Sequence, residues 1–284
     1  MSFTIDLNGK TAVVTGGGQG VGRAICLSLA TAGARVLVND YVSDRAEAVA
    51  KEITESGGNA VASPFDVSDY AAATKAITAE PVDILVNNAG NAGPAVRDAK
   101  APAAPSAPGT PDTPGAGVRG PSVSLGEFAN TEPADWERYF AVNLFGVMNC
   151  IRAALPHMIA SSHGRIITIV SDAGRVGEPH MAPYAAAKAG AAGLTRAVAR
   201  EVGRDGITVN NVALGTVDTI GLEAMARESE VVADRVRRQL KRYIIPRLGQ
   251  PDDVAGLITF LAGPAASWIT GQTYPVNGGY SVTL

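Results

Sequence analysis

The sequence predicts an α/β protein of the Rossmann type, with a doubly wound parallel sheet flanked by helices on both faces. Two observations predict this class. Short β-branched and aliphatic runs alternate with longer helical segments along the chain, which is the order expected of βαβ units. The first apolar run also leads directly into a glycine-rich turn and a helix, where backbone N–H groups can accept a phosphate.

Length and composition allow one large α/β domain or two small ones, and we expect a single domain spanning residues 1–284. The chain is 46% hydrophobic and 18% charged, and it can bury a substantial core without disulfides. Its net charge of −3 gives no general attraction to nucleic acid or to anionic membranes. No apolar run approaches about 18 residues and no signal peptide is visible, so we expect a cytoplasmic protein that does not span a membrane. The histidines show no metal-ligand spacing, and no metal site is predicted.

The apolar and amphipathic runs predict the elements in order. The expected strands cover residues 10–15, 35–39, 60–65, 83–87, 163–171 and 206–215. The expected helices cover residues 23–33, 44–56, 69 onward, 132–159, 182–203, 222–243 and 251–263. Pro133 suits the first turn of the helix at 132–159, and Pro156 is expected to bend its end.

Residues 91–121 interrupt this pattern with a proline-, alanine- and glycine-rich insert. Seven of the 17 prolines fall there, so an irregular or extended loop is expected. The insert leaves the predicted sheet after Gly90, at the strand ends where ligands of such sheets bind. Two interpretations are open. The insert is either a semi-rigid flap over the site or a strap across a neighbouring subunit, or it is a functionally neutral insertion.

The glycine turn runs from Gly16 to Gly22 with the spacing Gly16-xxx-Gly20-x-Gly22. The literal dinucleotide pattern GxGxxG is absent, but the turn stands between a predicted strand and a predicted helix. In that context it favours a pyrophosphate site built from backbone N–H groups. An ordinary glycine-rich turn is the alternative.

Asp40 ends the second predicted strand, about twenty residues after the glycines. A carboxylate there can accept hydrogen bonds from an adenosine ribose and repel a 2′-phosphate. Neither Gln19 nor Tyr41 is basic, so no adjacent cation offsets that repulsion. The residue therefore predicts NAD rather than NADP, with a helix-start role as the alternative.

Tyr184 and Lys188 lie four residues apart, which puts both on one face of the predicted helix, one turn apart. A free tyrosine has a pKa of about 10. A cation one turn away, and a positively charged cofactor ring, would favour the phenolate and lower that pKa. Ser171 ends the predicted strand 163–171, where ligand sites of parallel sheets collect. A surface tyrosine and a solvated lysine are the alternative that the pair alone leaves open.

Taken together, these motifs resemble the short-chain dehydrogenase/reductase family over essentially the whole chain. The runs HGRIITI, YAAAKAG and GITVN are most similar to bacterial 3-oxoacyl-acyl-carrier-protein reductases and related dehydrogenases. The glycine spacing differs from that of the extended, epimerase-like branch. The matching motifs are Thr15-Gly16-xxx-Gly20-x-Gly22, Asp66, Asn87-Asn88-Ala89-Gly90, Asn143, Ser171, Tyr184-xxx-Lys188 and Val276-Asn277-Gly278-Gly279.

The resemblance implies a seven-stranded parallel sheet with a nicotinamide cofactor across the strand ends. It assigns Tyr184 as the acid/base and Ser171 as the donor to the substrate oxygen. It also implies that Lys188 holds the nicotinamide ribose and lowers the pKa of Tyr184, and that Asn143 holds a water linking Lys188 to solvent. This set suits hydride transfer, which requires a proton to move on oxygen and a donor for developing charge.

The resemblance also implies the cofactor contacts. Asp66 and Val67 would meet adenine, and Asn88 the adjacent ribose. Val217 and Thr219, after the sixth strand, would meet the carboxamide. The complete expected cofactor-binding set is Gly16, Gln19, Gly20, Val21, Gly22, Asp40, Asp66, Val67, Asn88, Ala89, Gly90, Tyr184, Lys188, Val217 and Thr219.

Two features depart from the family pattern. Leu214-Gly215 stands where Pro-Gly is usual after the sixth strand, which keeps the glycine and loses the fixed proline φ. The loop after Gly90 is about twenty residues longer than is usual in the family, so the resemblance assigns no role to residues 91–121.

We therefore expect an NAD-dependent enzyme that interconverts a secondary alcohol and a ketone. Substrate specificity is expected in the loops 91–125, 173–183 and 215–245, the last being the main substrate-loop region. Their apolar residues, Met181, Ile220, Leu222 and Met225, favour a partly apolar small molecule such as an acyl thioester, a cyclic alcohol or a steroid. The alternatives are an NADPH-dependent 3-oxoacyl-thioester reductase and a non-catalytic NAD-binding protein. Apolar and small residues on helices 133–160 and 182–203, together with the resemblance, predict a homotetramer.

Overall fold

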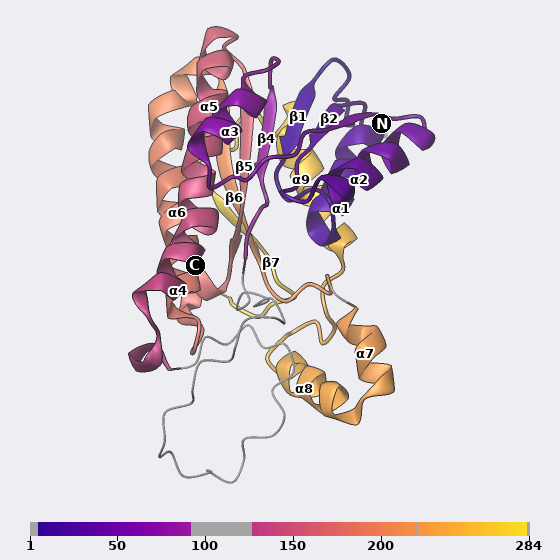
Figure 1. Cartoon of the computed structure of the whole chain (residues 1–284), viewed down its shortest axis with the longest axis vertical. Helices are drawn as coiled ribbons and strands as arrows, with labels where there is room; N and C mark the ends of the chain where they lie inside the picture. The colour runs from indigo at the N-terminus through magenta and orange to yellow at the C-terminus, as the bar shows by residue number, and fades with distance from the viewer. Residues whose placement is uncertain (1–4, 92–126, 220, 283–284) are drawn as a thin grey trace.

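A computed structural model describes residues 5–91, 127–219 and 221–282. Its centre is one parallel sheet of seven strands in the order β3-β2-β1-β4-β5-β6-β7 (Figure 1). The strands are β1 Thr11–Val14, β2 Arg35–Val38, β3 Asn59–Ala62, β4 Ile84–Asn87, β5 Gly164–Ser171, β6 Ile207–Leu214 and β7 Thr273–Val276. The predicted doubly wound α/β class is confirmed.

Helices cover both faces of the sheet. The helices α1 Gly20–Thr31, α2 Ser43–Glu55 and α9 Pro251–Ala262 pack on one face, and α3 Tyr70–Ile77, α5 Gly146–Ala160 and α6 Ala182–Val202 on the other (Figure 1). Successive strand residues face opposite cores, as in β1, where Val14 joins the first cluster and Val13 the second. This double burial explains why the strands are nearly continuous apolar runs.

The predicted helix 132–159 is broken by a wider turn. It consists of α4 Pro133–Phe140, a π-helical turn over Ala141–Phe145, and α5. Asn143 lies inside that turn, and its side-chain amide donates to the carbonyl of Tyr139 at 3.0 Å. In an α-helix the backbone N–H of residue 143 would bond that carbonyl, so the side chain supports the irregular turn.

The predicted helix 222–243 is two helices rather than one. The segment forms α7 Leu222–Glu228 and α8 Glu230–Leu240, with Ser229 between them in an extended conformation. Neither helix buries a residue, and Figure 1 shows both beyond the strand ends, away from the sheet. Most helices are stabilised by packing an apolar face against a core. Residues 222–243 have no such core to pack on, so their helical pattern did not predict one continuous helix correctly.

The insert predicted at 91–121 lies outside the described residues, apart from Asn91. Its loop character and its role stay predictions, as does the single-domain organisation. Within the described residues no helix has the length and apolar character needed to cross a membrane.

The carboxyl ends of the parallel strands meet at one edge of the sheet, and the segments that leave them build the site. Thr15 follows β1, Asn39 follows β2, Asn88 follows β4, and Ser171 ends β5. Because all seven strands are parallel, residues distant in the chain converge there.

Gly22 is the tightest point of the glycine turn, and we predict that Gly22→Ala destabilises the fold. An added Cβ would lie 2.0 Å from the carbonyl oxygen of Gly16 and 2.5 Å from Nδ2 of Asn88. The backbone would have to move, at a cost of about 1–3 kcal/mol in the free energy of unfolding, measured by urea denaturation. Gly256→Ala on α9 is the control, since a Cβ there meets no atom within 4 Å, and it should stabilise by up to about 1 kcal/mol. Equal stability of the Gly22→Ala variant and the wild type would contradict the packing.

Candidate active site

The glycine turn presents backbone N–H groups at the start of α1. Gly16 and Gly20 adopt positive φ angles of 62° and 52°, which favour glycine. Gln19 precedes the helix without a side-chain cap, so the first N–H groups of α1 remain available for an anion. A Cβ on Gly20 would meet the Cβ of Thr219 at 3.1 Å, so the segment after β6 closes the turn from the side. The predicted residues Gly20 and Thr219 are thus neighbours.

Asn88 and Ala89 hold the glycine turn against β4. The Nδ2 group of Asn88 donates to the carbonyls of Thr15 and Gly16, at 2.9 Å each. The backbone N–H groups of Asn88 and Ala89 both donate to the Thr15 hydroxyl at 3.0 Å. This clasp accounts for the sequence Asn88-Ala89 at the end of a strand; the predicted contact of Asn88 with a ribose stays a prediction.

Asp40 is buried at the end of β2, as expected of a residue that faces an enclosed ligand. One carboxylate oxygen accepts the backbone N–H of Val42 at 3.0 Å, and the other lies 2.7 Å from the Cβ position of Gly18. The Cβ of Arg45 lies 2.6 Å from that same position. The sequence analysis did not single out Arg45, which the first turn of α2 brings back beside Asp40. The Asp40 carboxylate and the start of the Arg45 side chain therefore border this part of the glycine turn.

The predicted adenine contacts differ in exposure. Asp66 is exposed, and its Oδ1 accepts hydrogen bonds from the N–H and hydroxyl of Ser68 at 2.8 and 2.7 Å. Val67 is buried and packs against Gly146, where an added Cβ would lie 2.7 Å from Cγ2 of Val67. Only Asp66 among the two offers a polar side chain to a ligand.

Ser171, Tyr184 and Lys188 come together between the end of β5 and the start of α6. Ser171 and Tyr184 are joined by a side-chain hydrogen bond. The Nζ atom of Lys188 lies 5.9 Å from the centre of the Tyr184 ring and donates to the carbonyl of Ile169 at 2.9 Å. The Lys188 side chain is buried, so the solvated-lysine alternative is wrong.

Burial moves the pKa values of both groups away from the charged form. It raises the pKa of Tyr184, and the hydrogen bond with Ser171 offsets only part of that increase. It lowers the pKa of Lys188 from 10.5 to about 8. In the protein chain by itself the pKa of Tyr184 is therefore raised, because burial is the largest effect on it. The role of Lys188 in lowering that pKa when a cofactor is bound stays a prediction. Further positive charge is needed to favour the phenolate.

Asn143 and Lys188 face the same point of the backbone. An added Cβ on Gly90 would lie 2.8 Å from Oδ1 of Asn143 and 3.2 Å from Nζ of Lys188. Among the described residues nothing donates a hydrogen bond to that buried Oδ1. A carbonyl oxygen and an ammonium directed at one small space suit a shared water molecule, the role expected of Asn143.

Asn91 is a site residue that the sequence analysis missed. The Nδ2 group of Asn143 donates to the backbone carbonyl of Asn91 at 3.0 Å and to its side-chain oxygen at 2.6 Å. Asn91 thereby anchors the start of the insert to the π-helical turn. Tyr139 was also missed: its ring lies 6.4 Å from that of Tyr184, edge to face. Asn91 begins the proline-rich insert and Tyr139 lies within a predicted helix, and neither pattern predicts contacts with residues distant in the chain.

The predicted carboxamide-binding segment follows β6. Leu214 ends that strand and accepts the N–H of Asp172 at 3.1 Å, while Gly215 packs against Asn277, with 3.0 Å between its Cβ position and the Asn277 Cα. Val217 pairs with Gly249 in an isolated parallel bridge. The glycine retained after Leu214 is thus required by a close backbone approach.

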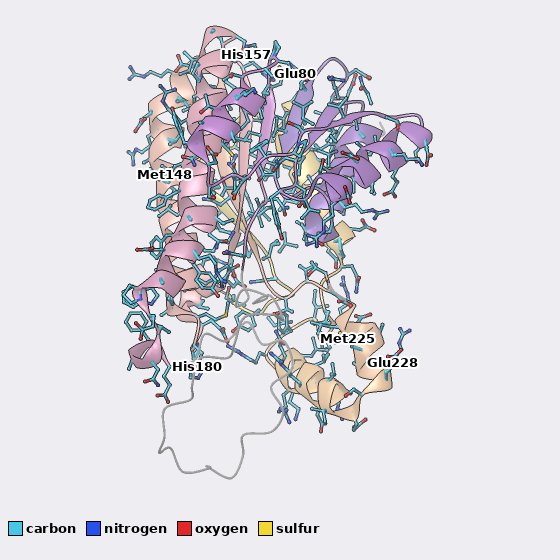
Figure 2. The ribbon with its side chains drawn as sticks, viewed as in Figure 1. Glu80, Met148, His157, His180, Met225 and Glu228 are labelled. Atoms are coloured by element: carbon cyan, nitrogen blue, oxygen red, sulfur yellow. The ribbon has the colours of Figure 1, made fainter. Side chains whose placement is uncertain are left out.

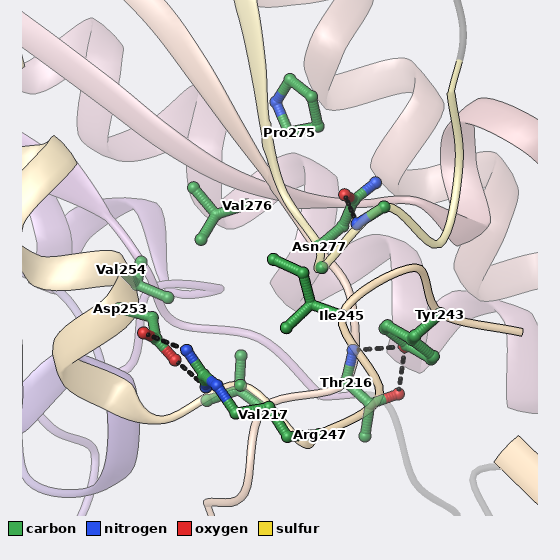
Figure 3. Close-up of a pocket in the computed structure, with 13 residues that line it drawn as sticks. Thr216, Val217, Tyr243, Ile245, Arg247, Asp253, Val254, Pro275, Val276 and Asn277 are labelled. Carbon is green, nitrogen blue, oxygen red and sulfur yellow. Dashed lines mark hydrogen bonds and ion pairs between the residues drawn. The ribbon is translucent and has the colours of Figure 1, made fainter. Parts of the chain in front are cut away.

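A pocket of about 360 Å³ lies behind this segment (Figure 3). Thr216, Val217 and Val276 form part of its wall, and the Arg247–Asp253 ion pair lies at one side. The pocket does not include Ser171, Tyr184 or Lys188. It is therefore separate from the cluster that those three residues form.

The expected substrate region lies at the strand ends. Figure 2 shows His180 and Met225 in the same lower part of the molecule, beyond the sheet. His180 is exposed and has a positive φ of 64°, and Met225 on α7 is 37% exposed.

The described part of the chain contains no group of three His, Cys, Asp or Glu side chains placed to hold a metal ion.

Known proteins resemble the chain along almost its whole length. A family model described as short chain dehydrogenase matches residues 10–104, and one described as enoyl-(acyl carrier protein) reductase matches residues 115–281. The 3-oxoacyl-acyl-carrier-protein reductase of Staphylococcus aureus (strain Mu50) is 36% identical over 278 residues, which cover 95% of this chain and 97% of the relative. The chain belongs to the short-chain dehydrogenase/reductase family. The family predicted from the motifs is therefore confirmed.

Other relatives of this short-chain dehydrogenase/reductase have different substrates. The 7alpha-hydroxysteroid dehydrogenase of Escherichia coli (strain K12) is 34% identical over 283 residues, covering 98% of this chain and 96% of the relative. The solved gluconate 5-dehydrogenase of Burkholderia cenocepacia, in complex with NADP and tartrate, has a TM-score of 0.80 at 31% identity and 98% coverage of both chains. A 3-oxoacyl-acyl-carrier-protein reductase of Brucella melitensis with bound NAD has a TM-score of 0.78 at 31% identity, covering 97% of this chain and 92% of that one.

As a short-chain dehydrogenase/reductase, the protein is an oxidoreductase that acts on hydroxyl or keto groups with an NAD(P) cofactor. The residues present fit that cofactor: the uncapped start of α1 suits a pyrophosphate, and Asp40 suits a ribose.

The burial of Lys188 predicts an unusual pH dependence of stability. Between pH 8 and 10.5 the folded state binds fewer protons at this residue than the unfolded state, so its contribution to stability rises with pH. Without cofactor, the free energy of unfolding of Lys188→Met relative to wild type should therefore fall by about 2–3 kcal/mol from pH 7 to pH 10. Lys51→Met, at a lysine whose side chain is 74% exposed, should show no such trend. A flat difference for Lys188→Met would contradict the lowered pKa.

Proposed function

We propose that this protein is an NAD(H)-dependent oxidoreductase that interconverts a secondary alcohol and a ketone, with Tyr184 as the acid/base. The observation that carries the proposal is the hydrogen bond between Ser171 and Tyr184 beside the buried Lys188. A ligand oxygen that reached both hydroxyls would meet one proton donor and one hydrogen-bonding partner at once. A non-catalytic NAD-binding protein would have no need of this arrangement.

The side chains divide the proton chemistry among them. A nicotinamide cofactor supplies or accepts the hydride when bound. Tyr184 donates its phenolic proton to the carbonyl oxygen in reduction, or takes the hydroxyl proton in oxidation, while Ser171 holds that oxygen. The Lys188 ammonium stabilises the phenolate, and Asn143 Oδ1, directed at the same space, offers the proton a route outward.

Reduction and oxidation need different protonation states of Tyr184, whose pKa is raised by burial. Reduction uses the neutral phenol, which burial favours. Oxidation uses the phenolate, so it depends on the positive charge of an oxidised nicotinamide ring near the site. The oxidative activity should therefore rise with pH more steeply than the reductive one.

The cofactor preference rests on Asp40. A 2′-phosphate about 4 Å from this carboxylate would be repelled by about 4 kcal/mol at an effective dielectric constant of 20, before relaxation and screening. The Cβ of Arg45 lies beside the same face of Gly18 as Asp40, and its positive charge favours the alternative, an NADPH-dependent 3-oxoacyl-thioester reductase. Asp40 is buried whereas Arg45 is exposed, so solvent screens the arginine more strongly. We therefore infer a preference for NAD.

We predict that kcat/KM favours NAD over NADP by at least about tenfold, because the repulsion from Asp40 survives partial screening. Asp40→Asn should reduce that ratio. Arg45→Ala should leave activity with NAD unchanged and lower the residual activity with NADP. Equal efficiency of the wild type with both cofactors would remove Asp40 from the role.

The substrate class is tested by a panel read at the nicotinamide absorbance: acetoacetyl-CoA, cyclohexanol, a 7α-hydroxysteroid and gluconate. Tyr184→Phe should lower kcat on every active compound by at least about 100-fold, because it removes the acid/base. Its NAD dissociation constant should stay near wild type. Tyr70→Phe, at a surface tyrosine 52% exposed, is the control. Retention of a tenth of wild-type kcat in Tyr184→Phe would move the acid/base elsewhere.

We also propose a homotetramer. Phe145 and Met148, on the outer side of the helix that runs through α5, are 52% and 42% exposed. Large exposed apolar side chains mark an association surface, and small residues on α6 allow close helix contact. Light scattering at micromolar concentration should return about four times the 29.0 kDa chain mass, and Phe145→Glu should lower it. A wild-type mass of one chain would contradict the tetramer.

A further inference from the structure

Asp172 follows Ser171 directly and is nearly inaccessible to solvent, at 2% exposed. Three side chains donate to its carboxylate, one from the next turn of the chain and two from the C-terminal segment. Arg175 and Ser281 reach Oδ1, each at 2.9 Å, and Asn277 reaches Oδ2 at 2.6 Å. No role in the chemistry described above uses this residue.

A buried carboxylate is costly unless charge pairing and hydrogen bonds replace its hydration. Here one guanidinium and two neutral donors do so. An asparagine in its place would present an NH₂ group to Arg175 or to Asn277, so a donor would face a donor. The position therefore requires an acceptor on both sides, which only an acidic residue supplies.

The turn that begins at Asp172 connects Ser171 to the helix that carries Lys188. The N–H groups of Arg175 and Val176 both donate to the Asp172 carbonyl at 2.9 Å, and that of Ala173 donates to the Ser171 hydroxyl at 3.2 Å. A Cβ on Gly174 would lie 2.8 Å from the backbone nitrogen of Ala189 and 3.1 Å from the carbonyl carbon of Lys188. The turn is thus packed between the two catalytic elements.

Asn277 connects the same carboxylate to the cofactor side. Its Cα lies 3.0 Å from the Cβ position of Gly215, and Gly215 donates its N–H to Val276 at 3.2 Å. Its own amide also donates to the carbonyl of Ser281 at 3.2 Å. The carboxylate of Asp172 therefore holds the end of β7 against both the catalytic turn and the segment that leads to Val217.

We propose that Asp172 is a positioning residue that fixes the Ser171 hydroxyl relative to Tyr184 by pinning residues 172–175 to residues 277–281. The proposal rests on the proposed roles of Ser171 and Tyr184. It explains why a buried carboxylate stands next to a serine at the reacting centre. Without it, the turn that holds the Ser171 hydroxyl loses its anchor to the sheet edge.

Loss of this anchor should change the pKa of Tyr184 in a predictable direction. The Ser171 hydrogen bond lowers the pKa of Tyr184, so weakening it raises that pKa further. Removing the negative charge of Asp172 would by itself do the opposite and favour the phenolate. The other groups that face Tyr184 are Lys188 on its own helix and Tyr139, with Arg138 over the Tyr139 ring, on α4. Positioning and direct charge effects of Asp172 therefore move the Tyr184 titration in opposite directions.

The first test uses tyrosinate absorbance and needs neither substrate nor cofactor. The titration of Tyr184 is obtained by subtracting the absorbance curve of a Tyr184→Phe variant from that of the same protein with Tyr184 present. This difference is measured once in the wild-type background and once in the Asp172→Asn background. Only pH values at which circular dichroism shows intact folds are used. The difference curve should move to higher pH by about half a unit or more, as loss of one hydrogen bond implies. An unchanged curve, or one moved to lower pH, overturns the proposal.

The second test is kinetic, on the most active compound of the panel. Asp172→Asn should lower kcat by about 10–100-fold, as expected of a misplaced catalytic group, with the KM for NAD close to wild type. Asp83→Asn is the matched control: Asp83 also accepts from a cation, Lys10, and from a backbone N–H, that of Thr11, at 3.1 and 3.0 Å, but at the opposite strand ends. The same loss of kcat in Asp83→Asn would overturn positioning in favour of general destabilisation.

A milder variant covers the case in which Asp172→Asn does not fold. Ser281→Ala removes one of the three donors and leaves the ion pair, and it should shift the Tyr184 titration in the same direction with a smaller fall in kcat. Wild-type behaviour of Ser281→Ala in both measurements would then overturn the proposal. If no compound of the panel is turned over, the proposed function fails, and the titration still decides the role of Asp172.

Discussion

The ammonium of Lys188 is held in the interior, 5.9 Å from the centre of the Tyr184 ring, and most of the candidate site is arranged around it. Its hydrogen bond goes to the carbonyl of Ile169, and its end lies beside Gly90, where no side chain would fit. The turn at Gly174 packs on its backbone. Among the described residues no carboxylate pairs with this buried cation, and burial lowers the pKa of Lys188 to about 8. In the proposed function, the same ammonium would stabilise the phenolate of Tyr184.

Long-range contacts give the site its rigidity. The glycine turn is tied to β4 through Asn88, and the catalytic turn is tied to β7 through Asp172 and Asn277. A second tie lies further along the catalytic segment, where Glu178 accepts two hydrogen bonds from Arg242 and one from Tyr280. Arg242 follows α8, so the segment between Ser171 and Tyr184 is joined both to the end of β7 and to the exposed helices beyond the strand ends. Each tie replaces side-chain freedom with a defined geometry, as hydride transfer requires.

The proposed preference for NAD rests on a contrast in solvation. Asp40 is buried beside Gly18, whereas Arg45 reaches the same region from an exposed turn of α2. Charges of opposite sign at similar positions act unequally when one is shielded from water and the other is not. The relatives bear out that this fold accommodates both nucleotides, since one solved structure holds NADP and another NAD.

The sequence by itself determined the doubly wound sheet, the family, and the positions of the glycine turn, Asp40, Ser171, Tyr184 and Lys188. These are local signals: a strand buried on both faces must be apolar, a positive φ favours glycine, and a four-residue spacing fixes one helix face. Only the tertiary structure showed the π-helical turn at Asn143, the contacts of Asn91 and Arg45, the anchoring of Asp172 to Asn277, and the break at Ser229. It also showed that burial raises the pKa of Tyr184 in the protein chain by itself. Each of these depends on burial or on a partner distant in the chain, and neither is encoded in the spacing of neighbouring residues.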